Sequence, residues 1–167
     1  MDNIHPVSFI IRRATDQDTS SILECLGAAF EPYRLSYSAD AFRDTVPAPE
    51  AIRDRLATMI VLVAVESNAA VVGTVAGSCL ETSEGHLRGM AVAPTWQGSG
   101  VAHDLLAAIE AELRALGCGR ITLDTTEPLH KAMQFYRKHG YEPSGRVTDF
   151  FGMPLHEYVK SSRAARP

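Results

Sequence analysis

The amino-acid sequence predicts an α/β fold in which a mixed, mostly antiparallel sheet carries helices on its faces. Apolar runs of strand length alternate with amphipathic segments of helical length, in the order β-α-α-β-β-β-α-β-α-β-β. A glycine-rich turn at 97–102 separates an apolar strand from a long helix-forming segment. The chain has 167 residues, 46% of them hydrophobic, so we expect a single domain over 1–167.

The N-terminal part predicts a strand followed by a mainly helical stretch. A short apolar strand at 8–13 leads into an amphipathic helix, for which Asp16 or Asp18 can serve as the N-cap. Prolines, tyrosines and acidic residues make 31–50 a loop that contains a short helix. Pro49 can begin a further helix, because proline is well tolerated in the first helical turn.

Three strands are predicted in the middle of the chain. Residues 59–65 and 70–80 are apolar and rich in β-branched side chains, and Asn68 lies between them. This pattern is typical of a hairpin. Residues 85–92 follow as the next strand.

The C-terminal part predicts two helices and three strands. Apolar residues occupy one side of the helix predicted at 100–116, and Gly117 ends it. A helical crossover of this length joins parallel neighbours, so the strand at 121–124 should lie parallel to the strand at 85–92. The remaining predicted elements are a helix that starts near Pro128 and ends at Gly140, and an antiparallel pair at 141–146 and 153–160.

The turn at 97–102, QGSGVA, predicts a phosphate site. A helix start exposes unpaired N–H groups and a partial positive charge, and both suit a phosphate or pyrophosphate. Gly98 and Gly100 lack a Cβ, so a ligand can approach the backbone closely. The turn has no Lys, which argues against a P-loop. A dinucleotide fingerprint without its last glycine, with Asp124 downstream, and a plain strand-to-helix connection remain as alternatives.

Two blocks of residues resemble the Gcn5-related N-acetyltransferase (GNAT) family. The first is similar to the family's acetyl-CoA motif V-x-P-x-x-Q-G-x-G-x-A, carried here by Val92, Pro94, Gln97, Gly98, Gly100 and Ala102. The second is similar to A-x-x-[FL]-Y-x-K-x-G-[FY], carried by Ala132, Phe135, Tyr136, Lys138, Gly140 and Tyr141. With their surroundings the two blocks cover about residues 85–145, which the resemblance identifies as the CoA-binding core.

The resemblance implies a GNAT-like sheet whose fourth and fifth strands, a parallel pair, splay apart to admit the pantetheine arm of acetyl-CoA. Gly89 is the expected position of the accompanying bulge. The implied cofactor-binding residues are Met90, Ala91, Val92, Gln97, Gly98, Ser99, Gly100, Val101, Ala102 and Tyr136. Many family members have Asn at the position of Leu129, so one hydrogen bond to the arm is not expected here.

The activity implied is direct transfer of an acetyl group from acetyl-CoA to a primary amine of a small molecule or peptide. The resemblance places Tyr136 beside the cofactor sulfur, where a phenol can protonate the departing thiolate. Packing against Phe135 is the alternative role for this side chain. A non-catalytic acyl-CoA sensor or partner-docking module is the competing function, and a nicotinamide-dependent oxidoreductase is a third.

A general base is required because an alkylamine is mostly protonated at neutral pH. The candidates are Glu81, Glu84 and His86, with a water relay lacking any single base as the alternative. Strand alternation would place His86 on one face of its strand together with Arg88, Met90 and Val92.

The acceptor is expected to bind at 31–50 and 145–155, the segments that family members use. Aromatic and acidic side chains there suggest a cleft for a cationic amine, formed by Tyr33, Tyr37, Asp40, Asp44, Asp149 and Phe150. A homodimer through the last strands is possible by the same resemblance, since 153–159 is apolar.

Composition argues against several other classes of function. A net charge of −4 and a pI of about 5.8, without a basic stripe, argue against nucleic-acid binding. The longest apolar run, 59–65, is too short for a membrane span, and Asp2 and Asn3 open the chain without a secretory signal. Three widely spaced cysteines predict free thiols in a reducing compartment, so we expect a cytoplasmic protein without a metal site.

Overall fold

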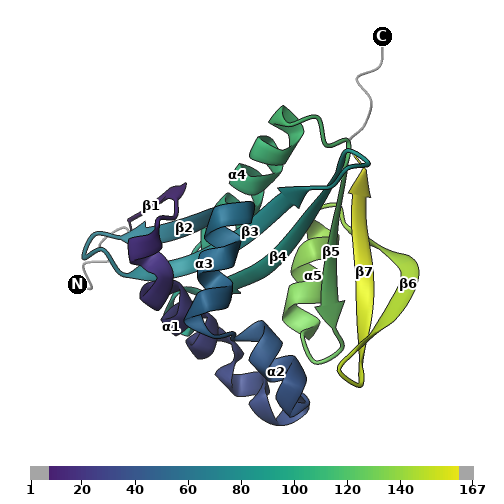
Figure 1. Cartoon of the computed structure of the whole chain (residues 1–167), viewed down its shortest axis with the longest axis horizontal. Coiled ribbons are helices and arrows are strands. Elements are labelled where there is room, and N and C mark those ends of the chain that lie inside the picture. The colour runs from purple at the N-terminus through teal and green to yellow at the C-terminus, as the bar shows by residue number, and fades with distance from the viewer. Residues whose placement is uncertain (1–7, 162–167) are drawn as a thin grey trace, which may run out of the picture.

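Seven strands form one mixed sheet at the centre of the molecule (Figure 1). They are β1 Phe9–Arg13, β2 Ile60–Glu66, β3 Val71–Cys79, β4 Glu84–Val92, β5 Arg120–Thr126, β6 Glu142–Phe150 and β7 Met153–Ser161. Their order across the sheet is β1-β2-β3-β4-β5-β7-β6, and every neighbouring pair is antiparallel except β4 and β5. The computed structural model describes residues 8–161, so the prediction about the start of the chain lies outside the described residues.

Helices cover both faces of the sheet, as predicted. The α-helices of the described residues are α1 Thr19–Phe30, α2 Ala39–Thr45, α3 Pro49–Thr58, α4 Val101–Ala115 and α5 His130–Lys138. Side chains of α4 and α5 share one core cluster with the sheet, and those of α1 and α3 share another cluster on the opposite face. None of these helices is long and apolar enough to cross a membrane.

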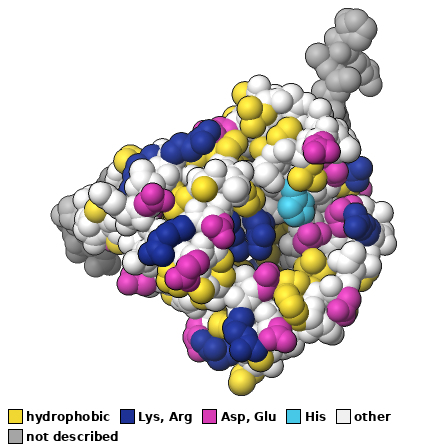
Figure 2. Space-filling model, in the orientation of Figure 1, with side chains coloured by type: hydrophobic (Ala, Val, Ile, Leu, Met, Phe, Trp, Pro, Cys, Tyr) yellow, Lys and Arg dark blue, Asp and Glu magenta, His cyan; other side chains and the backbone are white. Residues whose placement is uncertain are grey.

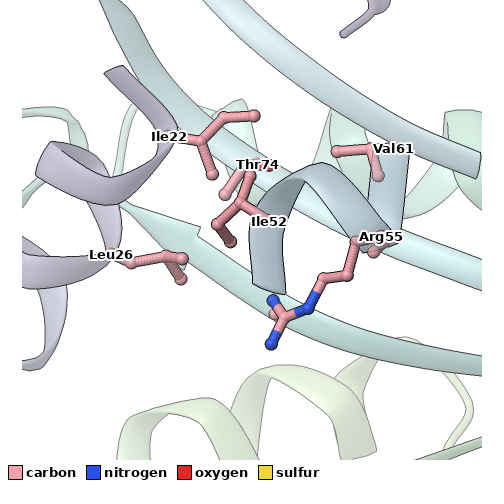
Figure 3. A pocket seen from close by; sticks show the side chains of 8 residues that line it. Ile22, Leu26, Ile52, Arg55, Val61 and Thr74 are labelled. Carbon is pink, nitrogen blue, oxygen red and sulfur yellow. The ribbon is translucent and has the colours of Figure 1, made fainter. Parts of the chain in front are cut away.

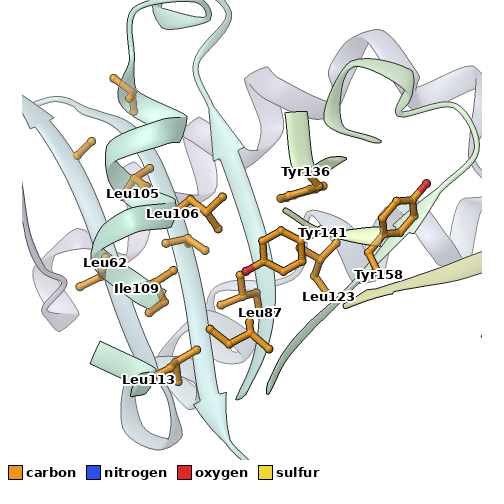
Figure 4. Close-up of a cluster of buried hydrophobic side chains, with 14 of the residues drawn as sticks. Leu62, Leu87, Leu105, Leu106, Ile109, Leu113, Leu123, Tyr136, Tyr141 and Tyr158 are labelled. Atoms are coloured by element: carbon orange, nitrogen blue, oxygen red, sulfur yellow. The ribbon is translucent and has the colours of Figure 1, made fainter. Parts of the chain in front are cut away.

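The core beneath α4 fixes the position of the glycine-rich turn, because the helix begins directly after it. Leu105, Leu106, Ile109 and Leu113 are fully buried against the sheet (Figure 4). Complete burial of each such side chain stabilises the fold by about 1.5–3 kcal/mol. The helix packs closely on β3, since a Cβ at Gly73 would lie 2.6 Å from Val101 Cγ1.

Replacing Gly73 with Ala should therefore destabilise the protein by about 1–3 kcal/mol, because the added methyl group overpacks the contact between β3 and α4. Gly27, inside α1, offers the matched control, since a Cβ there meets its nearest neighbour at an ordinary 3.9 Å. Gly27→Ala should stabilise the helix by about 0.5–1 kcal/mol. Urea unfolding of both variants measures the difference, and equal midpoints would contradict this account of the contact.

Several element boundaries differ from the predictions. The segment 31–50 contains a 3₁₀ turn, Glu31–Ser36, in addition to α2. Helix α5 begins at His130, two residues after Pro128, and β6 extends to Phe150.

Asp18 occupies the N-cap position of α1, as predicted, but its side chain makes no capping hydrogen bond. No side chain caps α1, because a 3₁₀ turn precedes it and the Asp18 carboxylate turns back along the chain. This carboxylate accepts hydrogen bonds from Arg12 at 2.7 and 2.9 Å and from the Thr15 N–H at 2.8 Å. The hydrogen bonds from Arg12 are the main cause that lowers the pKa of Asp18. The carboxylate thus ties β1 to the start of the helical layer.

Candidate acyl-transfer site

Strands β4 and β5 separate halfway along their length. They pair only from Glu84 to Leu87 and from Arg120 to Leu123, in parallel, and the rest of each strand diverges (Figure 1). Backbone groups of β4 beyond Leu87 on this side therefore have no strand partner in β5. This confirms the splayed parallel pair, and it opens a slot in the sheet where a ligand with amide groups can replace a strand.

A β-bulge lies at Gly89, as expected. The pairing register between β3 and β4 shifts here, since Ala76 pairs with Arg88 and Thr74 pairs with Ala91. Gly89 has a φ of +64°, a conformation that L side chains rarely adopt. The bulge places one extra residue in β4 at the mouth of the slot.

The bulge makes the predicted alternation of β4 side chains wrong. Met90 and Val92 pack toward the α4 core, whereas Ala91 belongs to the cluster of α1 and α3. Leu87 also belongs to the α4 core, so His86 and Arg88 lie on the opposite face from Met90 and Val92. One inserted residue exchanges the two faces for everything that follows it.

The glycine-rich turn presents bare backbone to solvent. Gly98 and Gly100 have φ of +81° and +92°, and a Cβ at either would meet nothing within 4 Å. Gly100 is the N-cap of α4, and its carbonyl accepts the first hydrogen bond of the helix from Asp104 N–H at 3.0 Å. The N–H groups of Val101 and Ala102 precede that bond, so they lack an acceptor within the helix. The arrangement suits an anion at the helix start.

Side chains of the turn are engaged in its own structure. The Gln97 side-chain amide donates to the Val92 carbonyl at 3.2 Å, and the Ser99 hydroxyl donates to the Trp96 carbonyl. Val101, the first residue of α4, is buried and anchors the turn to the core. The N–H groups of Gln97 and Ser99 also donate within the turn, to the carbonyls of Pro94 and Trp96, so the N–H groups at the start of α4 are the donors available to a ligand.

Tyr136 lies in α5 within an aromatic cluster beside the slot (Figure 4). Its ring contacts Phe135 and Tyr141, with centroids 5.5 and 5.9 Å away. The phenol makes no hydrogen bond within residues 8–161, and burial raises its pKa well above 10. The hydroxyl therefore keeps its proton at neutral pH and has its donor free. Leu129 stands where many family members have Asn, and its hydrogen bonds are those of its backbone. Its N–H donates to the Thr126 carbonyl at 3.1 Å, and its carbonyl accepts from Met133 N–H at 3.0 Å.

His86 lies where β4 and β5 begin to separate, and β5 supplies its partners. One ring nitrogen, Nδ1, is 2.8 Å from the Thr122 hydroxyl, and the other, Nε2, is 3.5 Å from the Asp124 carboxylate. Burial is the main cause that raises the pKa of Asp124, and the nearby Glu157 adds to it. No sequence motif singles out Glu157, and the only motif that includes Asp124 is a dinucleotide fingerprint.

The other predicted bases lie away from the slot. Glu81 is exposed in the turn between β3 and β4, and Glu84 faces Arg120 at 3.8 Å. The strand alone separates Glu84 from Met90 by about 20 Å, so Glu81 lies farther still. The structure brings His86 toward the slot and leaves Glu81 outside it.

Most side chains of the predicted acceptor cleft have partners within the fold. Tyr37 is buried and its hydroxyl is 2.6 Å from that of Thr126. Phe150 packs with Tyr37 and Phe42, which joins α2 to the β6–β7 hairpin. Asp40 forms an ion pair with Arg43, and Asp44 forms one with Arg88. The Asp149 carboxylate accepts a hydrogen bond from the Gly152 N–H.

Reactive thiols and metal ligands do not gather at the slot. Cys25 is buried, and burial raises the pKa of its thiol to about 11. Cys79 and Cys118 lie together at the opposite end of β4, with sulfur atoms 2.6 Å apart. Within residues 8–161 no three His, Cys, Asp or Glu side chains gather as a metal site would require.

Comparison with known proteins gives a consistent result. Residues 20–141 match the acetyltransferase (GNAT) family. Aminoglycoside N(6')-acetyltransferase type 1 of Stenotrophomonas maltophilia is 42% identical over 71 residues, which make up 42% of this chain and 46% of that protein. The match thus spans about half the length of this relative.

Solved structures share the whole fold. The PaiA N-acetyltransferase of Thermoplasma acidophilum, in complex with coenzyme A, superposes with a TM-score of 0.77 at 17% identity, over 92% of this chain and 99% of that one. The ribosomal-protein-alanine N-acetyltransferase of Brucella melitensis gives 0.71 at 23% identity, over 91% and 99%. With the family match and the splayed β4–β5 pair, this likeness identifies the chain as a member of the GNAT acetyltransferase family.

Proposed function

We propose that this protein is an N-acetyltransferase that moves the acetyl group of acetyl-CoA to a primary amine of a small molecule. The observation that carries the proposal is the slot between β4 and β5, which leads from a bulge at Gly89 to a helix start built from left-handed glycines. A chain-shaped ligand with amides at one end and a pyrophosphate at the other fits both features. Membership of the GNAT family supports the same donor.

In this proposal the residues of β4 and the turn bind acetyl-CoA. Backbone groups of Met90, Ala91 and Val92 pair with the amides of the pantetheine arm in place of the missing part of β5. The backbone of residues 97–102, which includes Gln97, Ser99, Val101 and Ala102, surrounds the pyrophosphate. Gly98 and Gly100 lack a Cβ and so allow the pyrophosphate to approach the backbone closely. The N–H near Met90 polarises the thioester carbonyl.

Acid and base lie on either side of this carbonyl. His86, oriented by Asp124, removes a proton from the ammonium group through water, and the neutral amine attacks the carbonyl carbon. The carbon–sulfur bond then breaks, and Tyr136 gives its proton to the thiolate. The nitrogen, now bonded to the acetyl group, loses its second proton to form the amide, and this proton restores the Tyr136 phenol through water. Direct attack agrees with the state of the cysteines. Burial raises the pKa of the Cys25 and Cys118 thiols, and Cys79 lies with Cys118 at the opposite end of β4.

The proposal also covers the class of acceptor, the assembly of the protein and its location. A relative named for aminoglycosides supports a small-molecule amine, with a peptide amine as the second option. We infer that residues 1–167 form one domain, since a single sheet runs through the described part. A homodimer through β6 and β7 and a cytoplasmic location complete the proposal.

The first experiment is a calorimetric titration of the purified protein with acetyl-CoA, with CoA and NAD as separate controls. Binding of the two CoA species and not of NAD is the expected result. A screen for thiol release in the presence of amines then detects turnover. Binding of acetyl-CoA without thiol release from any amine would favour the acyl-CoA sensor, and no binding to either CoA species would overturn the proposal.

A further inference from the structure

Two arginines lie together beside the slot, on the face of the sheet that α1 and α3 cover. Arg55 of α3 reaches the bulge, where its Nη1 would lie 2.9 Å from a Cβ built on Gly89. Arg88 of β4 is on the same face, and its Nη2 is 3.7 Å from the Asp44 carboxylate. Two guanidinium groups thus lie near the Asp44 carboxylate, but only Arg88 forms an ion pair with it.

The unmatched charge belongs to Arg55. Its guanidinium makes no hydrogen bond and no ion pair within residues 8–161. The side chain passes over a small apolar pocket that includes Ile22, Leu26 and Ile52, and it ends beside β4 (Figure 3). Burial is the main cause that lowers the pKa of Arg55 to about 10. Repulsion by Arg88 adds to this shift and the charge of Asp44 opposes it, so the group is still charged at neutral pH. A partly buried cation without a partner is unfavourable unless a ligand supplies one.

The facing wall of the slot carries the opposite charge. Asp124 of β5 and Glu157 of β7 are neighbours in the strand pairing, and His86 lies 3.5 Å from Asp124. Figure 2 shows a hollow in the middle of this face, with basic side chains in it and a histidine and acidic side chains beside it. Glu157 itself faces Arg120 and Arg146 at 3.8 and 3.9 Å, so this wall is partly neutralised, whereas Arg55 at the bulge has no ion pair among the described residues.

We propose that the acceptor is an α-amino carboxylate, whose carboxylate binds Arg55 and Arg88 while its amino group faces the thioester. The inference rests on the proposed function. Arg55 contacts the residue directly before Met90, whose N–H would hold the thioester carbonyl, so the anionic group must lie within a few bonds of the attacking nitrogen. The planar fork of a guanidinium matches a carboxylate well. A polycationic acceptor would bring further positive charge toward Arg55.

The test compares acceptors that differ only in the carboxylate. Initial rates with phenylalanine and phenethylamine, and with lysine and cadaverine, give the ratio of kcat/KM within each pair. We expect the wild-type protein to prefer the amino acid in at least one pair by tenfold or more. Comparing kcat/KM for O-phosphoethanolamine and ethanolamine tests whether a phosphate binds at the position proposed for the carboxylate. An aminoglycoside tests whether a polycationic amine is accepted.

Arg55→Gln should reduce the preference about tenfold, because the neutral amide cannot form the charged, paired hydrogen bonds of a guanidinium with the carboxylate. Arg53→Gln, on the same helix but exposed, is the matched control and should leave the preference intact. A parallel titration of the CoA-bound protein with N-acetylphenylalanine and N-acetylphenethylamine needs no turnover. Only the carboxylate-bearing product should bind more tightly to the wild type than to Arg55→Gln.

The outcomes separate the two proposals. If CoA binds and amines are acetylated regardless of the carboxylate, the inference fails and the proposed function stands. Preference for the phosphate-bearing amine or the aminoglycoside, or equal effects of Arg55→Gln and Arg53→Gln, would also overturn the inference. If CoA does not bind, the proposed function fails first and the inference falls with it.

Discussion

Replacing Tyr136 with Phe should lower kcat for acetyl transfer about 100-fold, because proton donation by a positioned side chain contributes roughly 10²–10⁴ in rate. The KM for acetyl-CoA should change little, since the ring that packs against Phe135 and Tyr141 is retained. Folding stability should also be nearly unchanged, because the lost hydroxyl makes no hydrogen bond within the described residues. Steady-state kinetics with a thiol-release assay measure kcat and KM, and urea unfolding measures the folding stability.

Tyr141 provides the control for this experiment. It is fully buried in the same aromatic cluster, so Tyr141→Phe removes a hydroxyl from the same cluster without touching the proposed acid. Its kcat should stay within about twofold of the wild type. Equal kcat in the Tyr136 variant and the wild type would assign Tyr136 to packing alone, whereas a matching loss in both variants would indicate damage to the cluster.

Replacing Gly100 with Val should weaken CoA binding about 100-fold. A Val side chain strongly disfavours the φ of +92° at this position, and straightening the turn would redirect the N–H groups at the start of α4. If the turn keeps its shape, the isopropyl group instead occupies the open space above the backbone, where the pyrophosphate would bind. Calorimetric titration with CoA measures the loss.

Gly117 separates this effect from simple strain. It also has a φ of +92° with nothing within 4 Å of a built Cβ, but it follows the other end of α4. Gly117→Val should therefore cost a similar amount of stability, of the order of 1–2 kcal/mol for the left-handed backbone, and leave CoA affinity unchanged. Loss of CoA affinity in both variants would show that the helix as a whole, and not its first turn, governs binding.

The order of strands and helices was predictable because it depends on local periodicity. The stripe from Leu105 to Leu113 predicts a helix lying on a sheet, and its length requires the parallel relation of β4 and β5. Family membership was predictable from two short blocks, and the comparisons confirm it.

Long-range pairing explains what the sequence did not reveal. Alternation failed at Gly89 because a bulge moves all later residues of β4 to the other face, and a periodic pattern cannot count the inserted residue. Asp18 was predicted as a helix cap, but Arg12 of the neighbouring strand binds its carboxylate. Arg55 is an ordinary surface residue by its position in α3, and only the tertiary fold brings it to Gly89.

The short pairing between β4 and β5 has a consequence for cooperativity. Four residue pairs join the β5–β7–β6 portion of the sheet to the β1–β4 portion, helped by the packing of α2 on the β6–β7 hairpin. A bound pantetheine arm would complete the unpaired stretch and join the two portions. Ligand at 100 times its Kd adds about 2.7 kcal/mol to the stability of the whole protein. Part of that energy would hold the two portions of the sheet together, so the donor would act as a removable strand.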